Sequence, residues 1–300
     1  MKHIILTGAG GMLGREILRQ CSFMCDTEIY AISSQADELR IEFSDDHNIH
    51  IFDSVSFLPS LGVFVVINCA FPRISDGKAL VTAMDNTLVT LDALAEKGIV
   101  AFINISTQSV YSQYKIEIPD ESFSVAPRDL YGLAKYSTER LLILKQSITG
   151  IKVVNVRLSS LISPDFDQRM INRFYDKLLR NQDILIEEGN TKISFMEISD
   201  AAKALLKMAT MIDKSSHNIY NLGNSDWLSL SSIAHECFSY YENRARTDSK
   251  LIIRNTGSLY NNVVDSSRFN STFSYRAECG MLDIISQIGR RKIRGDEFHQ

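Results

Sequence analysis

Short apolar runs alternate with stretches of helical periodicity along the first half of the chain. The apolar runs are rich in β-branched and aromatic residues and span residues 3–7, 28–32, 49–52, 64–68, 100–105 and 152–157. Helical periodicity is clearest between them at 77–96 and 129–145. Near-continuous apolar strands predict a parallel sheet covered on both faces, because half-exposed antiparallel strands alternate polar and apolar residues. The pattern therefore predicts an α/β fold with a doubly wound parallel sheet of the Rossmann type.

The pattern becomes irregular beyond about residue 159. Helices are expected at 168–180, 200–211, 229–241 and 279–288, and short strands at 183–186 and 192–198. We expect residues 1–158 to form the main domain. Residues 159–300 are expected to form a smaller, mostly C-terminal lobe, interleaved with strands that return to the main sheet.

Composition and charge describe an ordinary globular protein. The chain has 300 residues, of which 45% are hydrophobic and 23% charged, so it can bury a large core. A net charge of −4 gives no general attraction to nucleic acid or to an anionic membrane, and we expect neither as a partner. The basic cluster at 290–294 has no interleaved aromatic residues and is expected to be a solvated tail after the last helix.

The cysteines give no sign of a metal centre or a disulfide framework. The chain has five of them, an odd number, and none is in a CxxC pair, so we expect reduced thiols and no metal site. The apolar run 63–71 is too short to cross a bilayer, and the first residues show no signal-peptide pattern. A cytoplasmic location is expected.

The segment LTGAGGMLGRE places Gly8, Gly11 and Gly14 directly behind the first apolar run. A strand that enters a helix through a glycine-rich turn leaves unpaired N–H groups at the helix start, in its first turn at Met12 and Leu13, where a pyrophosphate can bind. Gly8 permits the tight turn, Gly11 the close approach of the phosphates, and Gly14 the packing of helix on strand. The spacing is one residue longer than the usual GxGxxG fingerprint, and the alternative is a simple turn. Its position after the first strand favours phosphate binding, which makes residues 1–158 a predicted dinucleotide-binding domain.

The end of the second strand indicates which dinucleotide is bound. An acidic residue there binds the ribose hydroxyls of NAD, whereas this chain has Ser33 and Ser34, which tolerate the extra phosphate of NADP. Arg40 is a candidate partner for that phosphate. We expect NADP, with NAD as the alternative. Under the alternative, Ser33 caps a loop and Arg40 is solvated. Asp53 and Ala70, which follow the third and fourth strands, are further expected cofactor contacts.

Tyr131 and Lys135 are four residues apart, which on a helix places them on the same face. A phenol is a poor acid or base at neutral pH, and a nearby ammonium brings its pKa toward the working range. Thr107 ends the fifth strand. Because ligands of open parallel sheets bind beyond the carboxyl ends of the strands, Thr107 is expected to face the same crevice as the glycine turn. Otherwise the pair is an ordinary surface pair and Thr107 a turn residue.

Several weaker motifs follow one another along nearly the whole chain. They are TGAGGMLG at 7–14, Asn86, STQSVY at 106–111, Pro119-x-Glu121 before Pro127, YGLAK at 131–135 with Glu139, Val156-Arg157 ahead of Pro164, the segment 195–200, and Tyr220-Asn-Leu-Gly223. In this order they resemble the extended short-chain dehydrogenase/reductase family of NAD(P)-dependent nucleotide-sugar epimerases, dehydratases and reductases. The resemblance implies that Tyr131 is the catalytic acid/base and that Lys135 grips the nicotinamide ribose and tunes the tyrosine. It further implies that Thr107 holds the substrate oxygen and that Asn86 supports the lysine; a plain surface amide is the alternative for Asn86.

The positions after Thr107 bear on which reaction is expected. The 4,6-dehydratases of the family carry an acidic pair there, whereas this chain has Gln108 and Ser109, so dehydration is not expected. Hydride transfer at a single carbon remains. We expect an NADP-dependent reductase of a nucleotide-linked 4-ketosugar, with an NAD-dependent nucleotide-sugar 4-epimerase as the alternative. A non-catalytic dinucleotide sensor is less favoured, since the Tyr, Lys and Thr are all retained.

The residues expected around the substrate depart from the family pattern. Ser109 is expected at the substrate, Ser160 replaces a common asparagine, and Lys192 lies beside a position where the family often has an arginine. Arg254 matches a second arginine that grips the diphosphate in the family. A nucleotide sugar is therefore the expected small-molecule substrate, and a smaller sugar, polyol or lactone the alternative. The resemblance also implies a homodimer formed through the helix that bears Tyr131.

Overall fold

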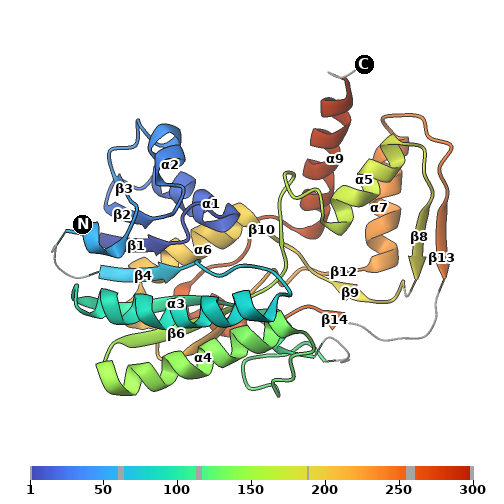
Figure 1. Ribbon diagram of the computed structural model, residues 1–300. Coiled ribbons are helices and arrows are strands. Elements are labelled where there is room, and N and C mark those ends of the chain that lie inside the picture. The colour runs from blue at the N-terminus through green and yellow to red at the C-terminus, as the bar shows by residue number, and fades with distance from the viewer. Residues whose placement is uncertain (1, 60–63, 113–116, 188, 255–260, 298–300) are drawn as a thin grey trace.

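Seven parallel strands form the central sheet of the protein. The computed structural model describes residues 2–59, 64–112, 117–187, 189–254 and 261–297. The strands of the sheet are β1 (Lys2–Thr7), β2 (Thr27–Ile32), β3 (Ile49–Phe52), β4 (Phe64–Asn68), β5 (Ile99–Thr107), β6 (Lys152–Leu158) and β11 (Ile219–Leu222). Their order is β11-β6-β5-β4-β1-β2-β3, and every neighbouring pair is parallel (Figure 1). The chain order reverses between β1 and β4, and the crevice beyond the strand ends at such a point is where ligands of this architecture bind.

Helices cover both faces of this sheet. On one face lie α1 (Met12–Cys21), α2 (Ala36–Glu42), α6 (Ile198–Thr210) and α8 (Ser267–Phe273); on the other lie α3 (Gly77–Ala95) and α4 (Leu130–Thr149). Successive residues of each strand face opposite sides. Ile4 and Leu6 pack in the core under α1 and α6, whereas Ile5 packs in the core under α3 and α4. Because both faces are buried, the strands read as nearly continuous apolar runs.

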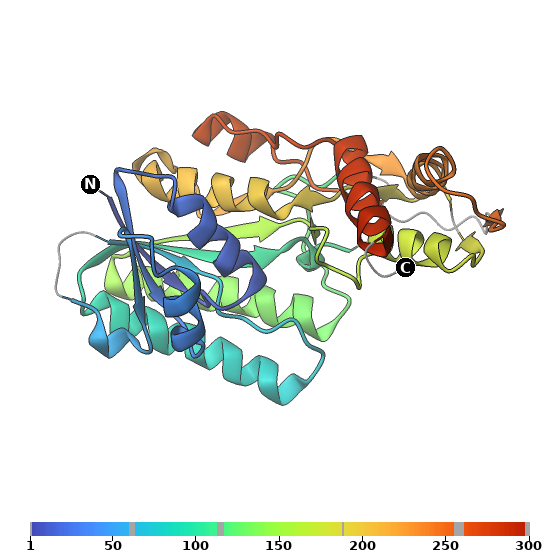
Figure 2. The same ribbon diagram turned by 90° about the horizontal axis from the view of Figure 1, so that it is seen from above.

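A second lobe extends from the carboxyl ends of the strands (Figures 1 and 2). Its core is formed by α5 (Met170–Leu179), α7 (Leu230–Glu242) and α9 (Met281–Glu297), which pack on the parallel pair β8 (Ile184–Glu187) and β13 (Leu251–Arg254). Short strands join the lobe to the sheet: β7 (Leu161–Ile162), β9 (Lys192–Ile193), β10 (Met196–Glu197), β12 (Leu228–Ser229) and β14 (Asn261–Asn262). Three 3-10 turns complete the described elements: η1 (Val55–Phe57), η2 (Gln108–Val110) and η3 (Ile212–Lys214).

The predicted fold class is confirmed by this seven-stranded parallel sheet. Two expectations about the second half are wrong. The strand expected at 192–198 is divided into β9 and β10, and α6 begins at Ile198, where Glu197 caps the helix by accepting from the Ser199 N–H. The basic cluster at 290–294 is no tail, because α9 continues through it and Lys292 pairs with Asp167 and Asp176 at 2.8 Å. The division of the chain into two domains at 158/159 stays a proposal. Strand β11 of the main sheet and helices α6 and α8, which cover one face of that sheet, lie beyond residue 159 in the sequence.

A row of buried polar side chains crosses the sheet at the ends of β1 and β4 and before the ends of β5 and β6. Thr7, Asn68, Asn104 and Asn155 are in register on β1, β4, β5 and β6. The Thr7 hydroxyl donates to Asn68 Oδ1 at 2.5 Å, Asn68 Nδ2 to Asn104 Oδ1 at 3.1 Å, and Asn104 Nδ2 to Asn155 Oδ1 at 2.9 Å. The row therefore ties four neighbouring strands together directly under the site.

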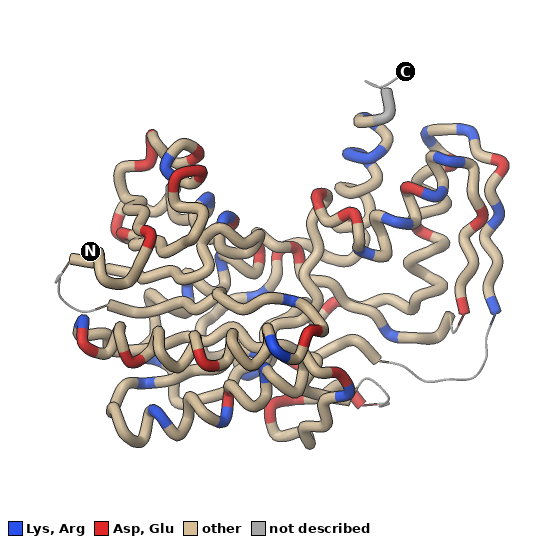
Figure 3. Tube along the Cα trace, in the orientation of Figure 1, with Lys and Arg blue, Asp and Glu red and all other residues tan. Residues whose placement is uncertain are grey.

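Charges of both signs are interspersed over the described parts of the two lobes (Figure 3). Such a surface lacks the one-signed face that steers nucleic acid. Among the described helices, none combines the length and the apolar character that crossing a bilayer requires.

Candidate active site

The glycine turn joins β1 to α1 and faces the crevice. Gly8 has φ +71°, and a Cβ there would lie 2.6 Å from the Ala70 nitrogen, so both the conformation and the neighbouring backbone require glycine. A Cβ on Gly14 would lie 2.4 Å from the Gly8 carbonyl oxygen, so this glycine lets α1 pack against the turn. Gly11 is the N-cap of α1 and offers no side-chain cap, which leaves the N–H groups of the first turn, at Met12 and Leu13, to a ligand.

Two cavities meet at this turn, and Gly8 and Gly11 line both of them. The smaller cavity, of about 300 Å³, reaches the ends of β2, β3 and β4 and is lined by Ser33, Ser34, Asp53 and Ala70. The larger, of about 680 Å³, extends from Met12, Leu13 and Gly14 toward the second lobe. Two compartments joined over a glycine turn fit the two halves of a dinucleotide whose diphosphate rests on the helix start.

Arg40 does not reach the smaller cavity. Its guanidinium pairs with Asp37 at 2.7 Å and with Asp53 at 2.6 Å. Ser33 is buried, and its hydroxyl accepts from the Gln35 N–H at 3.0 Å. The expectation that Arg40 waits for a 2′-phosphate is therefore not supported by the structure, since two carboxylates already hold its guanidinium and one of them, Asp53, lines the cavity.

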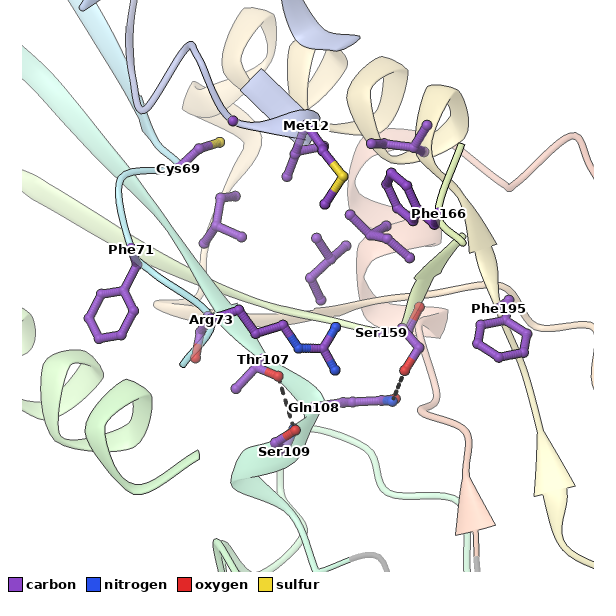
Figure 4. A pocket seen from close by; sticks show the side chains of 18 of the residues that line it. Met12, Cys69, Phe71, Arg73, Thr107, Gln108, Ser109, Ser159, Phe166 and Phe195 are labelled. Atoms are coloured by element: carbon purple, nitrogen blue, oxygen red, sulfur yellow. Dashed lines mark hydrogen bonds between the residues drawn. The ribbon is translucent and has the colours of Figure 1, made fainter. Parts of the chain in front are cut away.

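Tyr131, Lys135 and Thr107 all line the larger cavity. Asp129 caps α4 by accepting from the Gly132 N–H at 2.6 Å, which places Tyr131 in the first turn and Lys135 one turn later. Thr107 ends β5, and its hydroxyl accepts from the Ser109 N–H at 3.1 Å (Figure 4). The three side chains predicted from separate motifs are thus brought to one wall of the cavity.

Lys135 is held differently from the expectation. The residue is 3% exposed, and its ammonium donates to the Ile105 carbonyl at 2.7 Å and lies 3.9 Å from the ring centre of Phe71. Burial lowers the pKa of Lys135 to about 7. Burial also raises the pKa of the Tyr131 phenol, and the charges that oppose this rise come from Arg73 and Arg169. Lys135 is not among the charges that shift the pKa of the Tyr131 phenol, and its ammonium donates to a backbone carbonyl, so a tuning role for Lys135 stays a prediction.

The remaining predicted residues fall into two groups. Ser109 and Ser160 line the larger cavity. Asn86 is exposed on α3, and among the described residues it makes no hydrogen bond to the site. Lys192 lies over the Trp227 ring at 4.8 Å, and Arg254 is exposed at the end of β13; neither lines the cavity. The substrate contacts of Lys192 and Arg254 stay predictions without support from the geometry.

Other cavity residues were not predicted. Gln108, 8% exposed, donates through Nε2 to Ser160 Oγ at 3.0 Å and also to Asn262 Oδ1, while its buried Oε1 has no hydrogen-bond partner among the described residues. Arg73 and Arg169 bring two positive charges to the same space. Gln108 lies next to Thr107 in the sequence and was open to prediction, but the loop residues had no periodic signal.

A buried ion pair fixes the wall behind Tyr131. Glu139 on α4 accepts from Arg157 on β6 at 2.8 Å and from the Ser106 hydroxyl on β5 at 2.5 Å. Both charged side chains are fully buried, so each depends on the other for its charge. The pair holds α4 against β5, which ends in Thr107, and against β6. The positions of Tyr131 and Thr107 relative to each other are thereby fixed, as a site with a defined proton donor and acceptor requires.

The arrangement supports proton transfer at an oxygen held between Tyr131 and Thr107. A phenol and a hydroxyl on one wall can bind the same substrate oxygen, and the phenol can give or take its proton. Among the described residues no cluster of three or more metal-ligating side chains occurs. The hydride chemistry that such a site serves belongs to a bound dinucleotide.

Comparisons with known proteins agree with this geometry. The sequence model of the NAD dependent epimerase/dehydratase family matches residues 4–223. A curated Methanocaldococcus jannaschii protein, a putative UDP-glucose 4-epimerase, is 32% identical over 103 residues; this match covers 33% of the chain and 34% of that relative, about a third of its length. The structure of UDP-N-acetylglucosamine 4-epimerase from Bacillus cereus superposes with a TM-score of 0.77 at 21% identity, over 98% of this chain and 97% of that one. The dTDP-glucose 4,6-dehydratase of Bacillus anthracis, in complex with NAD, gives 0.78 at 14% identity, over 99% and 98%. At these identities the two structures show a shared fold.

Proposed function

The chain belongs to the NAD dependent epimerase/dehydratase family, and on this premise we propose that it is a nucleotide-sugar 4-epimerase. The observation that carries the proposal is the meeting of Tyr131, Thr107 and the glycine turn on one cavity. Gln108 and Ser109 occupy the place of the acidic pair that dehydration needs, which argues against the second activity of the family. The 4-ketosugar reductase expected from the sequence is less favoured, because the relatives compared are epimerases and dehydratases.

The side chains divide the work of such a reaction. The glycine turn at Gly8 and Gly11 and the start of α1 would hold a nicotinamide dinucleotide, which would supply reversible hydride transfer at a sugar carbon. In its phenolate form, Tyr131 would accept the sugar hydroxyl proton at its phenolic oxygen and, as the phenol, later give it back, while Thr107 holds the same sugar oxygen. The cavity of about 680 Å³ leaves room for the sugar to turn between the two transfers. The amides of Gln108 and Asn262 and the hydroxyl of Ser160 would bind sugar hydroxyls on the far wall.

NAD is the cofactor we propose within the NAD(P) dependence of the family. Arg40 is paired with Asp37 and Asp53, and the described residues that line the smaller cavity include no Lys or Arg to bind a 2′-phosphate. The Asp53 carboxylate lines that cavity and would repel a phosphate while accepting from ribose hydroxyls.

A homodimer is part of the proposal. Exposed apolar side chains gather on α3 and α4, namely Val81, Val89, Leu133, Leu144 and Ile148. Two helices with such a face bury it when paired with a second copy. A cytoplasmic location is also proposed, since all five cysteines are free thiols.

The purified protein tests the epimerase directly. We expect denaturation to release NAD, and the intact protein to interconvert UDP-glucose and UDP-galactose, or their N-acetylated forms, without added cofactor. Tyr131→Phe should lower turnover by about 10³-fold or more while the protein still carries its nucleotide. The matched control is Tyr136→Phe, one helical turn away and outside the cavity lining. A protein that purifies empty and oxidises NADPH stoichiometrically with a ketosugar would be a reductase instead.

A further inference from the structure

Two arginines share the larger cavity with Tyr131 and have no part in the machinery described so far. Arg73 lies between β4 and α3 of the main domain, and Arg169 is the N-cap residue of α5 in the second lobe. Both line the cavity, so they approach it from opposite lobes. Figure 4 shows the Arg73 guanidinium pointing into the cavity, toward Thr107 and Gln108.

Neither arginine has a counter-ion in the described part of the chain. No hydrogen bond or ion pair satisfies either guanidinium there, and the charged residues of the described lining are Arg73, Lys135 and Arg169, all cationic. Burial and, to a smaller extent, the neighbouring charge of Arg73 lower the pKa of Arg169 to about 10. Two guanidinium groups that face one space without an acid repel each other, and an anionic group between them would relieve that repulsion.

The two charges lie at the reacting end of the cavity. Both act on the Tyr131 phenol, where the proposed proton transfer takes place. A sugar carboxylate is separated from the reacting C4 carbon by a single ring atom, whereas the diphosphate lies across the sugar ring. Cations near the phenol are therefore better placed for a carboxylate.

Arg169 is held in position before any ligand binds. The segment that precedes it is tied to α9 by the pairs Asp165–Arg291 and Asp167–Lys292. The Arg169 N–H also donates to the Phe166 carbonyl at 2.8 Å. These contacts fix the backbone from which the Arg169 side chain enters the cavity, and its planar guanidinium is suited to a two-pronged contact with a carboxylate.

We propose that Arg73 and Arg169 together bind a carboxylate on the sugar, so that the substrate is a nucleotide-linked hexuronic acid rather than a neutral hexose. This inference rests on the proposed function. It narrows the substrate class, and it assigns specificity to two residues that no motif singled out.

Binding and conversion of matched ligands test the assignment. We expect the wild-type protein to bind UDP-glucuronate at least about 100-fold more tightly than UDP-glucose in calorimetric titration, and kcat/KM to show the same preference. Arg73→Gln and Arg169→Gln should each reduce that ratio by about 10- to 50-fold. Arg173→Gln is the control, because it removes the same charge from an exposed position one turn further along α5.

The third ligand, UDP alone, separates the two sources of an anion. If both variants weaken UDP as much as UDP-glucuronate, the arginines hold the diphosphate and the proposal is overturned. The proposal is also overturned if the wild-type protein shows no preference for UDP-glucuronate over UDP-glucose. In that case, conversion of UDP-glucose would still support the proposed epimerase activity. A strong binding preference without conversion of either sugar supports the carboxylate site and rejects the epimerase.

Discussion

The glycine turn and the far wall of the cavity are built in opposite ways. The turn is formed by neighbouring residues from Gly8 to Gly14, and its shape depends on contacts with the adjacent ends of β1 and β4. The far wall joins Gln108 to Ser160, 52 residues away, and to Asn262, 154 residues away. A local turn is fixed as soon as its strands pair, whereas the wall exists only when both lobes are docked. We therefore expect substitutions in the turn to act on stability and substitutions in the wall to act on substrate affinity.

Gly8→Ala should have the largest effect. Alanine would be strained at φ +71°, and its Cβ would lie 2.6 Å from the Ala70 nitrogen, a backbone atom that cannot move aside. We expect a loss of roughly 3–4 kcal/mol in the free energy of unfolding, measured in urea. Gly150→Ala is the matched control, because it shares the conformation at φ +72° but has open space around it, and it should lose about 1 kcal/mol. Equal losses of unfolding free energy in the two variants would show that the contact of Gly8 with the backbone of Ala70 contributes nothing.

Lys135 should make stability depend on pH, with a smaller effect. Burial lowers its pKa in the folded state to about 7, while the unfolded lysine keeps its proton up to its ordinary value of 10.5. Between pH 7 and 9 the unfolded state therefore binds more protons, so stability rises with pH, by at most about 1.4 kcal/mol per pH unit. Lys135→Met should flatten this slope in urea titrations at three pH values. A wild-type slope that persists in the variant would assign the dependence to another group.

Lys292→Met should have the smallest effect on stability, and it tests how the second lobe contributes to substrate binding. Lys292 holds Asp167 and Asp176, and through Asp167 it anchors the segment that carries Arg169. We expect a loss of at most about 1 kcal/mol in unfolding and a 3- to 10-fold rise in KM with kcat little changed. Lys203→Met, which breaks an exposed pair with Glu278, should leave KM as it was. A fall in kcat at constant KM would mean that the segment acts on the chemistry instead.

The same contrast explains what the sequence could predict. The strands were predictable because each is buried on both faces, and the glycine turn because its residues are adjacent. Arg73 lies in a connecting segment without periodicity, and Arg169 lies at the start of the helix predicted at 168–180, but nothing in the sequence placed either of them beside Tyr131. The run of basic residues at 290–294 is typical of a solvated tail and hides the end of the last helix. The apolar pattern does continue, because the buried Ile284, Ile285 and Ile288 are followed by the half-buried Ile293 at helical spacing.

The surroundings of Lys135 were beyond the sequence for a further reason. Its spacing from Tyr131 placed the two on one helix face. The ammonium, however, donates its hydrogen bond to the Ile105 carbonyl, a backbone group that any residue at that position would supply. Phe71, which covers the ammonium, comes from the loop after β4. Contacts of this kind depend on how the loop folds over the helix.

The row of hydrogen-bonded side chains from Thr7 to Asn155 also disfavours incorrect strand register in the sheet. Each donor from Thr7 to Asn104 finds its acceptor only if the next strand is docked without a shift of register. A strand that pairs one residue out of step turns these side chains away from one another and strands several buried amides, at about 1–3 kcal/mol apiece. Misaligned sheets are thereby disfavoured before either cavity is complete, and the correct register fixes how far β5 carries Thr107 beyond the glycine turn that follows β1.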